Sequence, residues 1–398
     1  MANQDKENTK KRREKGSGGI SLRKDGSWVG RFDAGVKPDG KRDVRTVYAK
    51  SEAECRRKLR ELIKQIHANE YVHVEKKSVK TYMNSWLVDV KKNELKPKSY
   101  DRLEQTLKYD VYPYIGDIQI GAIKSDNVQQ MINSLRDKNK SHSSIKKAYD
   151  AVNACFKLGV TKKTVALNPA IGVTIPSKKQ FKKKEIPFYT ADESAVLVAQ
   201  AMSRYKNGKR RYPVGAFVPF LINTGLRLGE LLSLQWNRDI DFDQKKVTVH
   251  TNLVSVKDRS KEKGYKLIEQ GNVKTDSGQD RTIPLNDDAV AALLNIHQVT
   301  GEKTYVMTTS GDKLMRPADL DQMFRRIAVA AGMPEEKIYG VHSLRHTFAT
   351  LLLSNNVDIK TVSKLLGHSD VTITYNTYIH VIKEQEAKAL ESIPKLIT

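Results

Sequence analysis

The stretch YGVHSLRHTFATLLLSNNVDIKTVSKLLGHSDVTITYNTYIH, residues 339–380, contains two histidines, an arginine and a tyrosine that can converge on one phosphate group. His342 and Arg345 are three positions apart, so a helix would place both side chains on the same face. Apolar residues at 348 and 351–353 supply the anchoring face of that helix, and the asparagines at 355 and 356 are typical of a helix end. The pattern predicts a helix that presents His342 and Arg345 to a ligand.

The second half of this stretch predicts two more helices, at residues 358–366 and 374–380. Gly367 suits the end of the first, because glycine readily adopts the left-handed conformation that ends many helices. His368 then lies just outside the helix, where its side chain can be aimed at a ligand. The second helix carries two tyrosines, Tyr375 and Tyr378, and this pattern alone leaves open which of them reacts.

The composition of the 398-residue chain predicts a globular protein of two or three domains with a polyanionic partner. Its formal net charge is +24, and nucleic acid is favoured over a membrane surface because neither a basic amphipathic helix nor a lipid-anchor motif is present. No apolar run approaches the roughly 20 residues of a membrane-spanning helix, and the first residues contain no apolar signal-peptide core. Cys55 and Cys155 lie far apart, so reduced thiols and a cytoplasmic location are expected.

The N-terminal part predicts a basic arm followed by a small mixed domain. Residues 1–15 are polar and lysine-rich, which is typical of a disordered arm. Within residues 16–77, strands are expected at 20–22, 28–35 and 42–48, followed by a helix with Ser51 and Glu54 as its capping box. Residues 1–77 carry 21 Lys and Arg against 12 Asp and Glu, which favours a reader of a DNA groove over a merely solvated domain.

The remaining chain predicts a helical domain, a linker, a larger mixed domain and a tail. Residues 78–176 suggest four helices, at about 79–93, 97–111, 124–138 and 141–158, with surface lysines able to follow phosphates. Residues 177–186 contain the charged run KKQFKKK and predict a linker. Helices up to residue 222 open the last domain, residues 187–381, and its other expected elements are strands at 240–242, 246–251 and 279–283 and helices at 287–298 and 317–331. The expected fold class is multidomain and mainly α-helical, with small β-sheets.

The sequence lacks the motifs for several other kinds of chemistry. It contains no HExxH, CxxC or GxxxxGK[ST] pattern, which argues against a zinc protease and a P-loop ATPase. The acidic run Asp239, Asp241 and Asp243 fails as a calcium loop, because Gln244 and His250 stand where glycine and glutamate are needed. We therefore expect side chains alone to carry the chemistry, without a metal or other cofactor.

Six residues together match what the transfer of a phosphodiester to a tyrosine requires: Arg227, Lys274, His342, Arg345, His368 and Tyr378. Each has a structural explanation when taken singly, as when Arg227 pairs with Glu230 three positions on. Together, the arginines can bind the non-bridging oxygens, the histidines can add hydrogen bonds, and the lysine can protonate the departing oxygen. The tyrosine is the nucleophile, and its phenol, with a pKa of about 10, needs this cationic surround to ionise at neutral pH.

These motifs resemble those of the tyrosine recombinases of the phage and conjugative-transposon integrase group. TGLRLGELLSLQW is similar to the family segment with the first arginine, here Arg227, and NVKTDSGQDRTIPL to the hairpin with Lys274. HSLRHTFAT resembles the segment with the His-x-x-Arg pair, LGHSD the one with the second histidine, and NTYIH the one with the nucleophile. The family places its tyrosine shortly before a histidine, which favours Tyr378 over Tyr375 because His380 follows.

The resemblance implies a domain plan and a set of partners. Residues 16–77 would bind arm sites on DNA, residues 78–176 core sites, and residues 187–381 would be catalytic. Residues 382–398 would form a tail for contacts between protomers of a tetramer. The implied partners are double-stranded DNA at element ends and target site, further copies of the chain, and an accessory DNA-bending or excision-directing protein.

The resemblance also implies a mechanism. Tyr378 would attack a scissile phosphate, leaving a 3′-phosphotyrosyl link and a free 5′-hydroxyl, with Lys274 as general acid. A 5′-hydroxyl from a partner strand would then attack that link and rejoin the DNA, which integrates or excises a mobile element such as a conjugative transposon or prophage. No metal or nucleotide is expected, because the phosphotyrosine conserves the energy of the bond.

Two other classes of protein stay open on the sequence. A type IB topoisomerase-like enzyme would share the tyrosine, arginines and histidine but relax DNA without exchanging partners, and the extra basic N-terminal domain favours recombination over it. A DNA-binding regulator would use the same residues structurally and form no covalent link with DNA.

Overall fold

The structure is a computed structural model, and it describes residues 18–36, 42–67, 77–181, 185–262, 264–271, 280–301, 303–309 and 313–391. The predictions that lie wholly or partly outside these residues include the arm at residues 1–15, Lys274, and the tail from residue 392. Parts of the domain at 16–77, residues 182–184 of the linker and the first residue of the strand expected at 279–283 also lie outside them. The chain divides into two compact units, one formed by Met1–Glu94 and Arg102–Phe181 and the other by Leu95–Asp101 and Lys182–Thr398. Within the described residues, no helix is both long enough and apolar enough to cross a bilayer.

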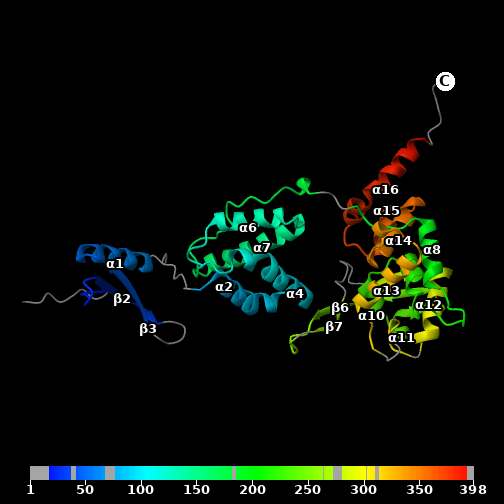
Figure 1. The fold of residues 1–398 in the computed structure, drawn as a ribbon, viewed down its shortest axis with the longest axis horizontal. Coiled ribbons are helices and arrows are strands. Elements are labelled where there is room, and N and C mark those ends of the chain that lie inside the picture. The colour runs from blue at the N-terminus through cyan, green and yellow to red at the C-terminus, as the bar shows by residue number, and fades with distance from the viewer. Residues whose placement is uncertain are drawn as a thin grey trace, which may run out of the picture. The chain divides into compact units, whose positions relative to one another are not determined.

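A three-stranded antiparallel sheet opens the first unit, as the sequence predicts. In it, β2 (Trp28–Val36) lies between β1 (Gly19–Leu22) and β3 (Arg42–Ala49). Helix α1 (Glu52–His67) packs on one face of the sheet (Figure 1), where Phe32, Leu59 and Leu62 are buried. The backbone nitrogen of Glu54 donates to Ser51 Oγ at 3.3 Å, so the expected helix start is confirmed.

The helical part of the first unit follows the four predicted helices, with two internal π-helical turns. The elements are α2 (Val79–Trp86), η1 (Leu87–Lys91), α3 (Lys92–Glu94), α4 (Pro97–Thr106), η2 (Leu107–Val111), α5 (Tyr112–Ile115), α6 (Ser125–Asp137) and α7 (His142–Thr161). The first half of α4, up to Asp101, belongs to the second unit. Each long helix buries an apolar stripe, with Met83, Leu107, Met131 and Phe156 among the fully buried side chains. A 3₁₀ turn, η3 (Lys178–Gln180), falls within the predicted linker.

The second unit is mainly helical around two small sheets. Its helices are α8 (Ala191–Ala201), α9 (Phe217–Thr224), α10 (Leu228–Ser233), α11 (Trp236–Asp239), α12 (Asp287–Thr300), α13 (Pro317–Ala330), η4 (Glu335–Lys337), α14 (His342–Ser354), α15 (Ile359–Leu366) and α16 (Val371–Glu391). One antiparallel sheet has the order β4 (Ile240–Asp241), β5 (Lys246–Val249), β8 (Arg281–Pro284). These elements confirm the expected mainly α-helical class with small sheets.

A hairpin of β6 (Thr251–Lys257) and β7 (Tyr265–Gly271) forms a second sheet that the sequence pattern does not predict. Predicted strands 246–251 and 279–283 do pair, since β5 runs antiparallel to β8 with Val247 opposite Ile283. The residues between them add the hairpin, in which Leu253 and Val256 are buried while most other positions reach solvent. A strand pair with so little buried apolar surface gives a weak alternating signal.

The end of α9 sets the position of α14, on which two predicted site residues lie. Gly225 ends α9 with φ of 61°, the left-handed region that favours glycine. A Cβ atom at this position would lie 2.3 Å from Cδ1 of Phe348, so α14 packs directly against the glycine backbone. This close approach brings the Gly225 carbonyl within reach of side chains on α14.

Candidate active site

Glu230 organises the two arginines nearest the start of α10. It is buried, and its Oε1 accepts from Arg227 Nη1 at 2.8 Å, while its Oε2 accepts from Arg281 Nη2 at 2.6 Å. Oε2 also accepts from the backbone nitrogen of Arg227 at 2.8 Å, which completes a capping box at the start of the helix. One carboxylate therefore fixes two guanidinium groups, and 41% of the Arg227 side chain still reaches solvent.

Arg345 is held by backbone carbonyls at the ends of two other helices. Its Nη1 donates to the Gly225 carbonyl and its Nη2 to the Leu366 carbonyl, each at 2.7 Å. Arg281 donates to the same Leu366 carbonyl, and Arg227 Nη2 lies 3.4 Å from the carbonyl of Gly367. The C-termini of α9 and α15 carry partial negative charge, so they stabilise this cluster of cations.

The loop after α15 positions the second predicted histidine. Gly367 ends α15 with φ of 66°, which leaves His368 beyond the helix as the sequence predicts. Its Nδ1 lies 2.8 Å from Oγ1 of the fully buried Thr374. Thr374 thereby fixes the imidazole ring near the Arg345 guanidinium.

Tyr378 lies at a break in α16, where its φ of −109° and ψ of 22° leave the helical region. The predicted short helix at 374–380 is therefore part of a longer one, from Val371 to Glu391, that is interrupted at the tyrosine. The ring packs with Phe348 and Leu366 in an apolar cluster between α14, α15 and α16. Only 1% of Tyr378 is exposed, so Oη must be uncovered before it can reach a DNA phosphate.

The hydroxyl of Tyr378 contacts a histidine that is not among the six predicted residues. Tyr378 Oη lies 2.8 Å from Nδ1 of His346, on α14. The His346 ring in turn meets the His342 ring edge-on, with centroids 4.8 Å apart. His342 and His346 are four positions apart on one helical face, and that spacing was the sequence signal that could have found His346.

Burial and the clustered cations shift the pKa values of the site in one direction. Burial, together with the charge of Arg227, lowers the pKa of Arg345 to about 9, so its guanidinium is still charged at neutral pH. Burial and the nearby cations lower the pKa values of His346 and His368 to about 4. Burial raises the pKa of Tyr378 to about 12, although Arg345 opposes the shift. At rest, the site holds neutral imidazoles, charged arginines and a protonated phenol.

The structure brings together five of the six predicted residues. Arg227, His342, Arg345, His368 and Tyr378 surround the ends of α9, α14 and α15, and Lys274 lies outside the described residues. The rival nucleophile Tyr375 is 41% exposed on α16, whereas Tyr378 lies beside His346. His346 and Arg281 are not among the predicted residues, and Arg281 has no local signal because its partner Glu230 is 51 positions away.

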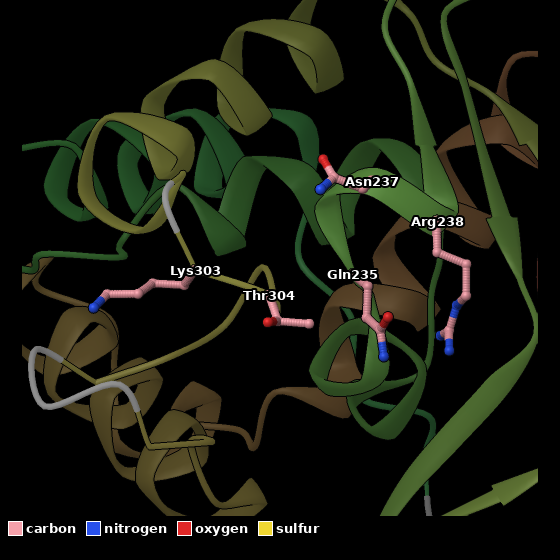
Figure 2. A pocket seen from close by; sticks show the side chains of 5 residues that line it. All are labelled: Gln235, Asn237, Arg238, Lys303 and Thr304. Carbon is pink, nitrogen blue, oxygen red and sulfur yellow. The ribbon is translucent and has the colours of Figure 1, made fainter.

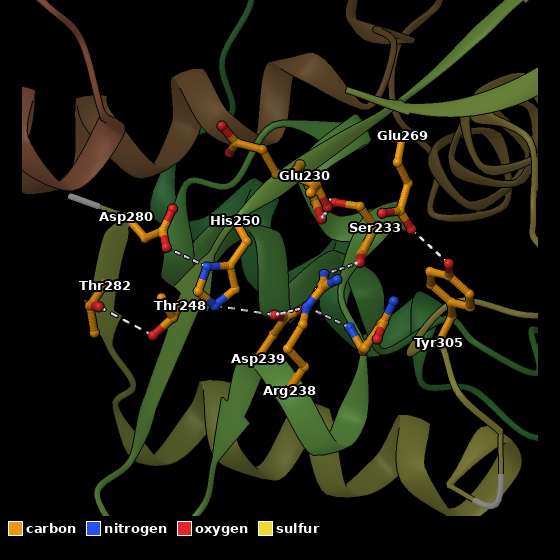
Figure 3. Close-up of polar contacts among 12 residues, drawn as sticks. Glu230, Ser233, Arg238, Asp239, Thr248, His250, Glu269, Asp280, Thr282 and Tyr305 are labelled. Carbon is orange, nitrogen blue, oxygen red and sulfur yellow. Dashed lines mark hydrogen bonds and ion pairs between the residues drawn. The ribbon is translucent and has the colours of Figure 1, made fainter. Parts of the chain in front are cut away.

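A second polar cluster in this unit contains Arg238, Asp239, His250 and Asp280, none of which is among the six predicted site residues. Arg238 Nε donates to buried Asp239 Oδ1 at 2.7 Å, and His250 Nδ1 lies 2.5 Å from Asp280 Oδ2 (Figure 3). The Arg238 side chain also lines a shallow hollow with Gln235, Asn237, Lys303 and Thr304 (Figure 2). The lining includes none of the six predicted residues, and its arginine is already paired, which favours a structural role.

We expect the two half-buried histidines, His346 and His368, to cause a loss of stability in mild acid. His346 and His368 have folded pKa values of about 4, below the ordinary 6.5, so between these pH values the unfolded chain binds more protons. Their stabilising contribution is complete above pH 6.5 and falls as the pH drops toward 4. We expect the melting temperature to decline over this window, and the decline to be smaller for His368→Asn. His297→Asn, at an exposed position on α12 outside the site, should leave the decline unchanged.

The fold and this arrangement define a class of protein: an enzyme that transfers a DNA phosphodiester to a tyrosine. The comparisons with known proteins agree. Residues 192–385 match the Phage integrase family, and residues 78–136 match the phage integrase N-terminal SAM-like domain.

Proteins with similar sequences are described as tyrosine recombinases. The XerC-like tyrosine recombinase of Caldanaerobacter subterraneus subsp. tengcongensis is 29% identical over 382 residues, which cover 91% of this chain and 94% of the relative. The tyrosine recombinase XerC of Pediococcus pentosaceus is 26% identical over 268 residues, covering 65% of this chain and 78% of the relative. The chain belongs to the tyrosine recombinases of the phage integrase family, and it is an enzyme that breaks and rejoins DNA.

Solved structures share the fold. A Tn1549 transposon integrase in complex with circular intermediate DNA superimposes with a TM-score of 0.60 at 20% identity, covering 79% of this chain and 99% of that one. A lambda integrase tetramer bound to a Holliday junction gives a TM-score of 0.53 at 14% identity, covering 90% and 93%. Both sequence identities are low, so these similarities show a shared fold and nothing beyond it.

Proposed function

We propose that this chain is a site-specific DNA recombinase that integrates and excises a mobile element through a 3′-phosphotyrosyl intermediate. The observation that carries the proposal is the fixing of Arg345 and Arg227 beside the end of α15. The Gly225 and Leu366 carbonyls hold Arg345, and Glu230 holds Arg227. Guanidinium groups held in this way are preorganised to bind a phosphate and to stabilise charge in the transition state.

The role of each side chain follows from its chemistry. Arg227 and Arg345 bind the non-bridging oxygens of the scissile phosphate, and His342 and His368 add hydrogen bonds. Tyr378 Oη attacks the phosphorus, the bond to the 5′-oxygen breaks, and Lys274 protonates that oxygen. A 5′-hydroxyl of a partner strand reverses these bond changes and joins the new strands.

The domain roles complete the proposal. A basic arm at 1–15 precedes residues 16–77, which bind arm sites. Residues 78–176 bind core sites, and residues 177–186 link them to the catalytic domain at 187–381. The face of the N-terminal sheet away from α1 supports the first of these roles, because Tyr48 is exposed there with Arg23 stacked over its ring at 5.4 Å. Aromatic and basic side chains together are typical of a surface that contacts nucleic acid.

The working unit is a tetramer on double-stranded DNA, with the tail at residues 382–398 contacting a neighbouring protomer. The solved lambda integrase tetramer on a Holliday junction and the Tn1549 transposon integrase support this assembly and a mobile element as the source of the DNA. An accessory DNA-bending or excision-directing protein completes the partners. The protein acts in the cytoplasm of a bacterium, where such DNA is found.

The binding of DNA should depend steeply on salt. With a net charge of +24, the chain makes many phosphate contacts, each of which releases a condensed counterion. We expect affinity to fall by about 10³-fold or more between 50 and 200 mM salt for six or more phosphate contacts. Fluorescence anisotropy with a labelled duplex at several salt concentrations measures the slope, and a flat dependence would contradict phosphate-dominated binding.

One experiment tests the function directly. The full chain is incubated with labelled duplexes that contain candidate element ends, and the products are separated under denaturing conditions. We expect a covalent protein–DNA complex with the protein on a 3′-phosphate, a free 5′-hydroxyl at the cut, and strands exchanged between two duplexes of different length. Relaxation of supercoiled DNA without exchange would instead indicate a topoisomerase, and binding without any covalent complex would indicate a regulator.

A further inference from the structure

The contact between His346 and Tyr378 joins the nucleophile to a side chain outside the predicted catalytic set. Nδ1 of His346 lies 2.8 Å from Oη, a normal hydrogen-bond distance, and the two rings are inclined at 62° with centroids 5.9 Å apart. The phenol ring is fixed by the apolar cluster around Phe348 and Leu366. Packing on one side and α14 on the other therefore hold the hydroxyl group beside one ring nitrogen, Nδ1 of His346.

We propose that His346 is a further catalytic residue, which accepts the proton of Tyr378 when Oη attacks the scissile phosphate. The inference rests on the proposed function and deepens it by assigning the proton acceptor of the attack step. It assigns the tautomer with hydrogen on Nε2, which leaves the Nδ1 lone pair facing the phenol.

The surroundings of His346 keep it available as an acceptor. Burial lowers the pKa of His346 to about 4, and so do the nearby His342 and Arg345 on α14 and His368 in the loop after α15. The imidazole is therefore neutral at physiological pH. A phosphodiester bound by the arginines brings negative charge into the same space, which opposes those cations and makes the protonated imidazole less unfavourable.

The proposed step balances in both directions. The proton moves from Oη to Nδ1, the Oη–phosphorus bond forms, and the phosphorus–oxygen bond to the 5′-side breaks with protonation of the departing oxygen by the general acid. In rejoining, a 5′-hydroxyl gives its proton to that same group and attacks phosphorus. The imidazolium of His346 returns its proton to the leaving phenolate, as microscopic reversibility requires.

Two substitutions separate proton acceptance from positioning. His346→Ala removes the acceptor, whereas His346→Asn places an amide oxygen close to the position of Nδ1, where it can accept a hydrogen bond but not a proton. Single-turnover cleavage is measured on an ordinary duplex and on one with a sulfur atom in place of the bridging 5′-oxygen. The sulfur leaves without a proton, so only defects in the attack step persist on that substrate.

We expect both variants to cleave about 10²- to 10⁴-fold more slowly on both substrates, the range typical of a lost acid–base group. Added imidazole should partly restore His346→Ala, because the half-buried ring leaves a cavity that opens toward solvent. Melting temperature and DNA affinity are measured alongside, and His297→Asn serves as a histidine control outside the site. Restoration by imidazole is a result that a purely structural role would not give.

Each other outcome overturns the inference. Near-parental cleavage by His346→Asn would show that His346 only positions the hydroxyl, and faster cleavage by either variant would show that it restrains the nucleophile. A defect that disappears on the sulfur-containing duplex would assign His346 to the leaving group. If the parental chain itself forms no covalent complex in this assay, the proposed function fails, which is a distinct result from normal cleavage by the variants.

Discussion

Tyr378→Phe is expected to bind DNA as the parental chain does and to form no covalent complex with it. The substitution removes one oxygen atom, and with it the nucleophile, while the ring keeps its packing in the cluster around Phe348 and Leu366. The arginines that would bind phosphate are untouched, so affinity should change by less than about threefold, or about 0.7 kcal/mol. Stability should fall by about 0.5–1.5 kcal/mol, because the hydrogen bond to His346 is lost.

The measurement is a denaturing gel of labelled DNA after incubation with each variant, with anisotropy for binding. Tyr375→Phe is the matched control, since Tyr375 lies one helical turn away and 41% of it is exposed. We expect this control to form the covalent complex at the parental rate. If Tyr378→Phe still formed the covalent complex, or if only Tyr375→Phe failed to form it, Tyr375 would be the nucleophile instead.

Arg345→Lys is expected to lower the rate of cleavage by about 10²- to 10³-fold, the effect of removing one preorganised donor from a transition state. The planar guanidinium donates to the Gly225 and Leu366 carbonyls in fixed directions, and a lysine ammonium cannot reproduce this fork. At least one of these carbonyls would lose the hydrogen bond that Arg345 donates, so we also expect a loss of about 1–3 kcal/mol in the free energy of unfolding.

Arg325→Lys is the control for this substitution. Arg325 forms a surface ion pair with Asp321 at 2.9 Å, and such pairs contribute about 0–1 kcal/mol. Its melting temperature and single-turnover cleavage should therefore match those of the parental chain. Equal cleavage by Arg345→Lys and Arg325→Lys would show that the guanidinium of Arg345 has no part in catalysis.

The sequence predicts most of the local structure around the site because the signals involved are local. The three-residue spacing of His342 and Arg345, the glycine that ends α15 and the pairing of Arg227 with Glu230 each depend on neighbours within one helical turn. The β6–β7 hairpin was missed because few of its residues are buried, so its alternating pattern is weak. The break in α16 at Tyr378 was missed as well, since it depends on packing against α14 and α15.

By itself, the sequence determined the mainly α-helical multidomain class, the basic charge and the identity of the residues that match the family. The tertiary structure alone decided which groups meet: Arg345 with a carbonyl 120 positions away, Arg281 with Glu230, and Tyr378 with His346. The physical reason is that these contacts join groups far apart in the chain, where no periodicity or cap links one to the other. Packing of α14 against Gly225 and α15 brings them together, and burial then sets the pKa values of the imidazoles and the phenol.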